Sequence, residues 1–253
     1  MNFIIHPNLK AKFYDLKSIV LNFENTGEVF GDGKRNTIKV IDWDNKKINI
    51  KSFKKPHLLN AIVYRFFRKS KARRSFEHAV KLLQLDIGTP TPYAYMENYS
   101  WFGGLSNSYY VSQHLECDFT IREVLKSEDF PDGHKILKKF TQFTHQLHES
   151  GVLFLDHSPG NTLVKKSASG KYSFYIVDLN RMQFKTLTFE ERIRNFSRLT
   201  SDKVMIEKLS IFYAPLLNES TEKVFELMWK YTQEFQSGFQ RKKALKKRFK
   251  ISK

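Results

Sequence analysis

The sequence predicts an α+β protein in two lobes, an N-terminal antiparallel sheet with one main helix and a mostly helical C-terminal half. In the first half, polar and apolar residues alternate in short segments separated by turn residues, as they do in β-hairpins. From about residue 118, apolar residues instead recur every three or four positions, as on one face of a helix. We expect the joint between the lobes near residues 114–119.

The predicted elements of the first half follow from this alternation. Strands separated by turns are expected over residues 19–53, in the segments IVLNF, GEVFGDGKRN, TIKVIDW and KINIKSF. A helical stretch is expected after Pro56, and the segment GTPTP (88–92) ends it. The apolar face of this helix is formed by Phe76, Ala79, Val80 and Leu83. Two further strands are expected in YAYMENY and SYYVSQHL.

The second half is predicted to be helical around one hairpin. TIREVL is a short helix, and a longer helix over residues 133–150 closes before Gly151. The strands NTLVKK and KYSFYIVD form a hairpin that turns at Ser169-Gly170, and everything from Phe189 onward is expected to be helical. The apolar stripe of the longer helix consists of Ile136, Phe140, Phe143 and Leu147.

The composition excludes several classes of protein. Of the 253 residues, 41% are hydrophobic and 27% charged, as in folded globular domains. Cys117 is the only cysteine, which excludes an intrachain disulfide or a multi-cysteine zinc site and favours a reducing compartment. No apolar run approaches the roughly 20 residues of a membrane-spanning helix. The N-terminal segment MNFIIHPNLKAKF lacks a signal-peptide pattern, and we expect it to be part of the folded protein.

The charge balance predicts an anionic partner. The chain has 43 Lys and Arg against 26 Asp and Glu, a net charge of +17. Such an excess suits nucleic acid, a nucleotide or an anionic membrane surface. The 23 Phe residues would permit stacking on single-stranded bases, but the spacing of many of them indicates a core.

Three polar residues in the second half match the needs of phosphoryl transfer. Asp156 and Asn161 are five positions apart in a Pro/Gly loop between a helix and a strand, and Asp178 ends the next strand. In such transfer one carboxylate accepts the proton of the acceptor hydroxyl, while an amide and a second carboxylate hold magnesium on the nucleotide phosphates. The spacing alone is common, but the order of loop, hairpin and strand-end aspartate is more specific. The alternative is that the two aspartates only cap helices or turns.

A second set of residues lies upstream. Lys51 lies in the predicted strand KINIKSF, and Glu77 borders the apolar face of the first main helix. A strand lysine held by a helix glutamate binds nucleotide phosphates in kinases, although each residue alone could equally be plain surface. Gly27, Gly31 and Gly33, in the order G-x-x-x-G-x-G, would let the backbone approach phosphates, or would simply form a hairpin turn.

With these motifs, the chain resembles the bacterial lipopolysaccharide core kinases, the Kdo and heptose kinase family, a lipid-associated branch of the protein-kinase-like fold. The resemblance runs from about Gly27 to Asn195, in the blocks KSFKKPHLLNAIVYRFFRKSKARRSFEHA, YYVSQHLECDFTIREVL, LDHSPGN and VDLNRM. It implies a nucleotide-binding lobe over residues 1–116 and a catalytic helical lobe over residues 117–253, with ATP and Mg²⁺ as cofactors. The roles it implies are catalytic base for Asp156, magnesium ligands for Asn161 and Asp178, and nucleotide binding by Lys51 with Glu77 and by the hinge stretch Gln113 to Glu116.

The sequence departs from the pattern of such kinases at two places. Phe154 stands two residues before Asp156, where relatives and protein kinases usually have a histidine. That histidine is generally structural, so the departure concerns the rigidity of the loop more than the chemistry. Asp178-Leu179-Asn180 replaces D-F-G, which is usual outside protein kinases, and the following Arg181 either contacts phosphate or is solvated.

Two segments carry much of the positive charge. In residues 54–74, eight basic residues are interleaved with apolar ones, and we expect this segment to pack on the first lobe with its cations toward substrate. The tail, residues 240–253, holds eight basic residues around Leu245, Phe249 and Ile251. Basic amphipathic segments of this kind bind anionic membranes, and the alternative is a solvated helix end.

The sequence hypothesis is therefore an ATP-dependent sugar kinase at the cytoplasmic face of the inner membrane, peripherally bound to it. The resemblance implies a Kdo hydroxyl of a lipid A–core or other Kdo-containing glycolipid as the acceptor, whereas the residues alone indicate only a hydroxyl on an anionic substrate. The alternatives are a kinase of this fold for another small molecule or a protein, and an inactive kinase-like module that binds anions. The joint presence of Lys51, Glu77, Asp156, Asn161 and Asp178 argues against the inactive module, and nucleic acid is not the expected partner.

Overall fold

The chain forms two compact units. The computed structural model describes residues 1–30, 36–55, 68–101 and 103–251. The first unit comprises Met1–Glu116 together with Asp178–Asn180, and the second comprises Cys117–Val177 and Arg181–Lys253. The short segment 178–180 thus belongs to the first unit although the chain reaches it from the second.

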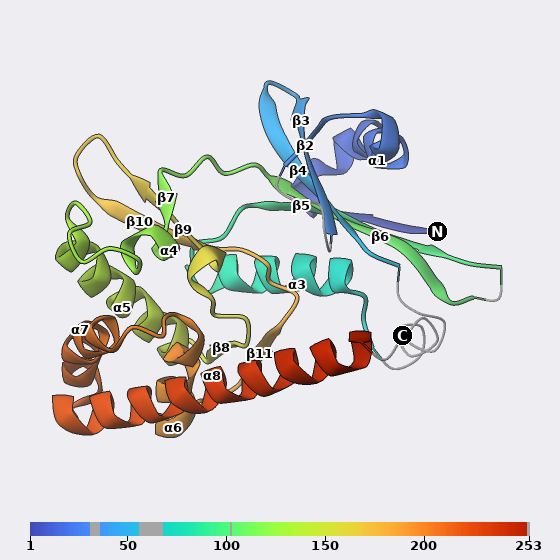
Figure 1. The fold of residues 1–253 in the computed structure, drawn as a ribbon. Coiled ribbons are helices and arrows are strands. Elements are labelled where there is room, and N and C mark those ends of the chain that lie inside the picture. Colours follow the sequence, from blue (N-terminus) through green and yellow to red (C-terminus); the bar gives the residue numbers. More distant parts are fainter. Residues whose placement is uncertain (31–35, 56–67, 102, 252–253) are drawn as a thin grey trace. The chain divides into compact units, whose positions relative to one another are not determined.

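The first unit is built on an antiparallel sheet in the order β1-β5-β6-β4-β3-β2 (Figure 1). Lys51 lies in one of the two central strands, opposite Ile38 of one neighbouring strand and Tyr110 of the other. The strands are β1 (Asn2–Ile5), β2 (Glu28–Val29), β3 (Asn36–Trp43), β4 (Lys46–Phe53), β5 (Pro92–Tyr99) and β6 (Leu105–Gln113). The helices are α1 (Phe13–Leu21), α3 (Lys71–Gln84) and the 3₁₀ helices η1 (Pro7–Lys12) and η2 (Phe23–Asn25).

Helix α1 corrects one prediction. The segment IVLNF is not a strand, because α1 runs to Leu21 and η2 follows it. Leu16 and Val20, one helical turn apart, are fully buried in a core with Ile48 and Ile50 of β4. The β-branched residues of IVLNF suggest a strand, but the spacing of Leu16 and Val20 fits a helix that covers one face of the sheet.

Helix α3 packs against β5 and β6, and Ser70 caps its N-terminus by accepting a hydrogen bond from the Arg73 amide at 3.0 Å. Phe76 and Ala79 are buried and Val80 is half-buried, as the sequence predicted, but Leu83 is exposed and Leu82 is buried instead. The helix ends at Gln84, before the GTPTP segment. Residues 56–67 lie outside the described part of the chain, and they include most of the apolar residues of the 54–74 segment.

The second unit contains a three-stranded sheet, β10-β9-β7, and a two-stranded one, β11-β8. Its strands are β7 (Phe119–Thr120), β8 (Val152–Phe154), β9 (Thr162–Lys166), β10 (Tyr172–Ile176) and β11 (Met182–Phe184). Its α-helices are α4 (Ile121–Val124), α5 (Gly133–Glu149), α6 (Phe189–Arg194), α7 (Lys203–Tyr213) and α8 (Thr221–Ile251). Its 3₁₀ helices are η3 (Pro159–Asn161), η4 (Asn195–Arg198) and η5 (Ala214–Leu217). The predicted long helix, the hairpin and the helical end are confirmed, whereas β7, β8 and β11 were not predicted.

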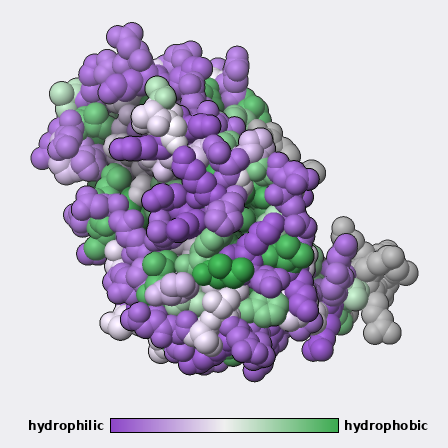
Figure 2. All heavy atoms as spheres, turned by 90° about the vertical axis from the view of Figure 1, so that its left-hand side faces the viewer, coloured by the Kyte–Doolittle hydropathy of each residue, from purple (hydrophilic) through white to green (hydrophobic). Residues whose placement is uncertain are grey.

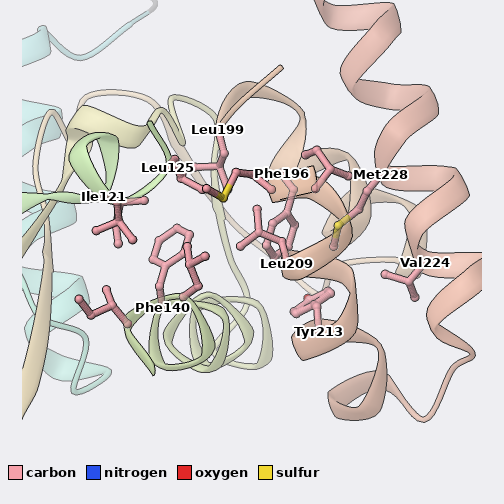
Figure 3. Close-up of a cluster of buried hydrophobic side chains, with 14 of the residues drawn as sticks. Ile121, Leu125, Phe140, Phe196, Leu199, Leu209, Tyr213, Val224 and Met228 are labelled. Atoms are coloured by element: carbon pink, nitrogen blue, oxygen red, sulfur yellow. The ribbon is translucent and has the colours of Figure 1, made fainter. Parts of the chain in front are cut away.

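The core of the second unit joins helices that are distant in sequence (Figure 3). Phe140 of α5 and Tyr213 of α7 are fully buried in it, and Phe196 of η4 lies 4.7 Å from Tyr213, ring centre to ring centre. Val224 and Met228 add the first turns of α8 to the same core. Burying large aromatic side chains in this way fixes η4 firmly within the unit.

The surface is largely polar. Figure 2 shows a face on which hydrophilic side chains predominate and hydrophobic ones form small separate areas. Within the residues that the structure describes, no helix has the length and apolar character needed to cross a membrane.

Candidate active site

Lys51 and Asp178 form an ion pair in the first unit. Because side chains alternate along β4, Lys51 lies on the face opposite Ile48 and Ile50, which are buried against α1. Its Nζ atom lies 2.7 Å from Oδ1 of Asp178, and both side chains are partly buried. The sheet therefore presents a lysine to the aspartate that the sequence predicted as a magnesium ligand.

The backbone of Asp178 is in the left-handed region, with φ of 61°. A side chain is rarely found there, and such strain is kept where the surroundings hold it. The amide nitrogen Nδ2 of Asn180 donates to the same Oδ1 at 2.7 Å. Both of these hydrogen bonds end on one carboxylate oxygen, which leaves Oδ2 as the oxygen for a cation.

Helix α3 holds the segment 178–180 through two residues that sequence reasoning missed. Nη1 of Arg74 donates to the Asn180 carbonyl at 2.5 Å, and Nδ1 of His78 lies 2.7 Å from the Leu179 carbonyl, to which it donates. Burial lowers the pKa of His78, so the ring is neutral and bears its proton on Nδ1. The two residues are four positions apart on one face of α3, a spacing that the sequence contains but that gave no sign of its target.

Glu77 is paired differently from the prediction. The sequence pairs Glu77 with Lys51, but its carboxylate accepts from Lys69 at 2.8 Å and from Arg73 at 2.9 Å. Burial alone would raise the pKa of Glu77, and these two hydrogen bonds outweigh it, so that the pKa lies below its ordinary value. In this structure Lys51 pairs with Asp178. The two cations that bind Glu77 come from the start of α3 and from the residues just before it.

In the second unit, Asp156 lies in the loop between β8 and η3. Nδ2 of Asn161 donates to the backbone carbonyl of Asp156 at 2.8 Å, and the Val177 amide donates to the Asn161 carbonyl at 2.9 Å. The first bond closes the six-residue segment 156–161 and uses the nitrogen of the Asn161 side chain, which leaves its amide oxygen for a cation. The predicted pair Asp156 and Asn161 is thus brought together.

The carboxylate of Asp156 has two arginines beside it. Nη2 of Arg198 lies 2.7 Å from Oδ1, and Nη1 of Arg181 lies 3.8 Å from Oδ2. The first distance is that of a charge-assisted hydrogen bond, and the second is too long for one. Neither arginine was predicted as a partner of Asp156, because nothing in the sequence around Arg181 or Arg198 indicates which carboxylate it contacts.

Behind the loop lies a buried polar chain. Tyr213 donates its hydroxyl to Nδ1 of His148 at 2.5 Å, and Nε2 of His148 donates to Oδ1 of Asn195 at 3.1 Å. Nδ2 of Asn195 donates in turn to the carbonyl of Phe154 at 2.9 Å. Burial lowers the pKa of His148 to about 3 and that of the neighbouring His157 to about 4, so both rings are neutral.

The remaining nucleotide-binding candidates are less defined. Gly31 and Gly33 lie outside the described residues. Gly27 has φ of 72°, and a Cβ at this position would lie only 2.7 Å from the Val40 carbonyl oxygen of β3, which leaves no room for a side chain. Glu116 is exposed and lies 3.6 Å from Nζ of Lys47. Gln113 and Glu116 line an open cavity of about 710 Å³ whose walls are mostly charged and polar, unlike the apolar walls of a purine site.

Asp178 and Asn161 both offer hard oxygen donors, the type that Mg²⁺ prefers. Within the described residues, no three His, Cys, Asp or Glu side chains gather as a preformed metal centre. A carboxylate and an amide that share the ion with nucleotide phosphates do not require such a cluster. Each of the two residues, in its own unit, therefore offers an oxygen of the kind that a magnesium ion arriving with a nucleotide takes.

The fold and these residues define a protein of the kinase-like class. The profile of the lipopolysaccharide kinase (Kdo/WaaP) family matches residues 26–224, which is most of the chain. The chain therefore belongs to this family, as the sequence motifs predicted. No curated protein sequence matches the chain.

Two solved structures are reported as similar to this chain. One is described as WaaP in complex with acyl carrier protein; it is 14% identical, with a TM-score of 0.62, and the match covers 94% of this chain and 99% of that one. The other is the Rio2 kinase–ADP/Mg²⁺–phosphoaspartate complex from Chaetomium thermophilum, at 14% identity and a TM-score of 0.46, covering 90% of this chain and 76% of the other. The first of these confirms the predicted protein-kinase-like fold.

Proposed function

We propose that this member of the family is an ATP-dependent kinase that phosphorylates a hydroxyl of Kdo in the inner core of lipopolysaccharide. The observation that carries the proposal is the loop of Asp156, closed by Asn161, in one unit, together with the Lys51–Asp178 ion pair in the other. These are the groups that phosphoryl transfer needs: a proton acceptor, oxygen donors for a metal and a cation for the phosphates.

Each residue has a distinct role in the proposal. Asp156 orients the acceptor hydroxyl and takes its proton, and Lys51 binds the phosphates of ATP. When bound, Mg²⁺ neutralises charge on the transferring phosphoryl group, and Asp178 and Asn161 are the residues that would hold it. Arg181, whose side chain is half exposed beside Asp156, suits the anionic groups of the acceptor.

A test of the reaction uses the purified protein, ATP, Mg²⁺ and a Kdo-containing lipid A precursor. We expect mass spectrometry to detect a glycolipid heavier by one phosphate, and fragmentation to place that phosphate on Kdo. Lipid A–core from cells with and without the protein gives the same comparison in vivo. Phosphate on another sugar would overturn Kdo as the acceptor and retain the kinase, whereas transfer to no acceptor would favour the inactive anion-binding module.

We also propose that the protein works at the cytoplasmic face of the inner membrane, bound peripherally. Among the side chains of α8 that the structure describes, that of Thr232 is the last buried one, and residues 239–245 are all exposed. From residue 235 to 253 the chain carries no acidic residue, and residues 240–253 hold eight basic ones. Each well-placed cation contributes about 1 kcal/mol of attraction to an anionic surface. The exposed Phe239 and Leu245 could enter the interface beside these cations.

Deleting residues 240–253 tests this contact. We expect the truncated protein to bind vesicles that contain phosphatidylglycerol more weakly and to lose activity on membrane-embedded acceptor more than on a soluble Kdo fragment. Because such attraction is screened over about 8 Å at physiological salt, added salt should mimic the deletion. Equal vesicle binding by both forms would make the tail a solvated helix end. Preference of the full chain for single-stranded nucleic acid at matched salt would overturn the membrane contact.

A further inference from the structure

The 3₁₀ helix η4 contacts three consecutive residues, from Phe154 at the end of β8 to Asp156 in the loop that follows. Asn195, its first residue, donates to the Phe154 carbonyl at 2.9 Å. Arg198, its last residue, donates through Nη1 to the Leu155 carbonyl at 2.9 Å, and its Nη2 forms an ion pair with Oδ1 of Asp156 at 2.7 Å. One short helix thus holds two backbone carbonyls and the carboxylate next to them.

The helix that supplies these contacts is itself firmly held. Phe196, between the two contacting residues, is fully buried and packs on Tyr213 in the core of the second unit (Figure 3). Asn195 is further held by His148. The guanidinium of Arg198 lies over the ring of Phe235 in α8, 5.4 Å from its centre. Contacts on three sides fix the place of the guanidinium, so that it can fix the carboxylate.

The two arginines beside Asp156 differ in a way that points to different uses. The Arg198 side chain is 30% exposed and makes one hydrogen bond and one close ion pair, whereas Arg181 is 52% exposed and lies 3.8 Å from the other carboxylate oxygen. Arg198 therefore occupies Oδ1, and Oδ2 has no hydrogen bond of comparable length from either arginine. A carboxylate held by one oxygen presents the second one in a fixed direction.

We propose that Arg198 is the positioning residue of the active site: it locks Asp156 through Oδ1 and so directs Oδ2 toward the acceptor hydroxyl. The inference rests on the proposed role of Asp156 in phosphoryl transfer. In that reaction the protein contributes chiefly position and charge, so a fixed proton acceptor serves it well. Arg198 also compensates for Phe154, which stands where related kinases have a structural histidine, because it holds the next carbonyl in the loop.

The test compares Arg198→Ala and Arg198→Lys with Arg194→Ala as the matched control. Arg194 ends α6, pairs with Glu234 and stacks on Tyr231, without a contact to the loop. Turnover is measured with the Kdo-containing glycolipid and, separately, as hydrolysis of ATP by water. Because a misplacement of about 1 Å costs about 10²-fold in rate, we expect Arg198→Ala to lower kcat about 10²-fold with little change in the KM for ATP. We expect Arg198→Lys to retain more activity, and Arg194→Ala to behave as wild type.

Two further measurements separate positioning from a loss of structure. Guanidinium ion at millimolar concentration should restore part of the kcat of Arg198→Ala and none of that of Arg194→Ala. In an Asp156→Asn background, Arg198→Ala should cause little further loss, since the residue acts through Asp156. Wild-type kcat in Arg198→Ala, or an equal loss with and without Asp156, would overturn the proposal. Hydrolysis that depends on Arg198 without transfer to the glycolipid would overturn the proposed acceptor and retain the role of Arg198.

Discussion

The two aspartates of the candidate site are held in opposite ways. In the first unit the backbone of Asp178 is strained into the left-handed region, and α3 holds the carbonyls that follow it through Arg74 and His78. In the second unit, the backbone before Asp156 is held by η4, and the carboxylate itself is held by Arg198. Asp178 is thus positioned by the turn it belongs to, and Asp156 by a side chain from outside its loop.

The two arrangements nevertheless share one feature, which is that the close contacts of each carboxylate fall on its Oδ1 atom. Lys51 and Asn180 both bind Oδ1 of Asp178, and Arg198 binds Oδ1 of Asp156. Each carboxylate therefore keeps one oxygen for the partner proposed for it, a metal ion at Asp178 and a hydroxyl at Asp156. The ammonium of Lys51 is a point charge on a flexible side chain, whereas the guanidinium of Arg198 is also held by the Leu155 carbonyl.

The largest expected effect comes from Asp156. Asp156→Asn removes the proton acceptor but no phosphate contact, so we expect turnover to fall roughly 10²–10⁴-fold while ATP affinity stays close to that of wild type. Steady-state kinetics and calorimetry measure the two quantities, and Asp129→Asn, at an exposed position of the same unit, is the control. More than about a tenth of wild-type turnover in Asp156→Asn would contradict the assignment.

The next effect concerns the metal. Asp178→Ala removes a donor to the ion itself, and we expect a loss of at least the 10–100-fold in Mg²⁺ affinity that a change in an outer-shell partner causes. Calorimetric titration with ATP should show that Mg²⁺ no longer improves binding to Asp178→Ala but still does so for Asp42→Ala, at an exposed position on β3. Unchanged Mg²⁺-dependent binding would move the metal to other residues.

The sequence predicted the parts of the site that are local and missed those that are assembled. The loop with Asp156 and Asn161 was predictable because six consecutive residues contain both its chemistry and its closing hydrogen bond. Arg198 was not, because it reaches Asp156 from 42 positions away and nothing in its own neighbourhood indicates a target. The hydrophobic pattern gave α5 and the hairpin for the same local reason, whereas the N-terminal helix was mistaken for a strand because its β-branched residues outweighed the spacing of Leu16 and Val20.

The pairing of Lys51 shows a further limit of the sequence. Lys51 and Glu77 are each recognisable, but which carboxylate the lysine takes depends on the competing cations Lys69 and Arg73 around Glu77. Such competition is decided by three-dimensional distance, and a motif does not contain it.

The third prediction tests this pairing. Lys51→Met removes a charge-assisted bond worth about 1.5–3 kcal/mol, and we expect kcat/KM for ATP to fall about 10–100-fold. Glu77→Gln breaks only the partly exposed pairs with Lys69 and Arg73, which are worth about 0–1 kcal/mol, so we expect a change of less than about fivefold. Equal losses in the two variants would mean that Glu77 holds Lys51 during turnover, as the sequence predicted. Lys55→Met, at an exposed position just after β4, is the control.

The smallest expected effect is on stability, and it distinguishes the two units by their buried histidines. The second unit keeps His148, behind the loop, and His157, within the loop, neutral, because burial lowers their pKa values to about 3 and about 4. In the unfolded chain each has a pKa of about 6.5. Between pH 6.5 and 4 the unfolded state therefore binds protons that the folded state does not bind. The stability that the neutral histidines contribute is present above pH 6.5 and is lost as the pH falls.

The size of this loss follows from one pKa unit of about 1.36 kcal/mol. At pH 5.5 we expect the free energy of unfolding to be lower than at pH 8 by about 1.4 kcal/mol for each of the two histidines. Urea unfolding followed by circular dichroism at both pH values measures it. His148→Gln cannot titrate but keeps an amide that can donate to Asn195, so whatever its own stability, it should lose about half of the pH dependence that the pair confers. If His148→Gln retained the full dependence on pH, the acid sensitivity would belong to other groups, and the buried chain from Tyr213 to Phe154 would not be its source.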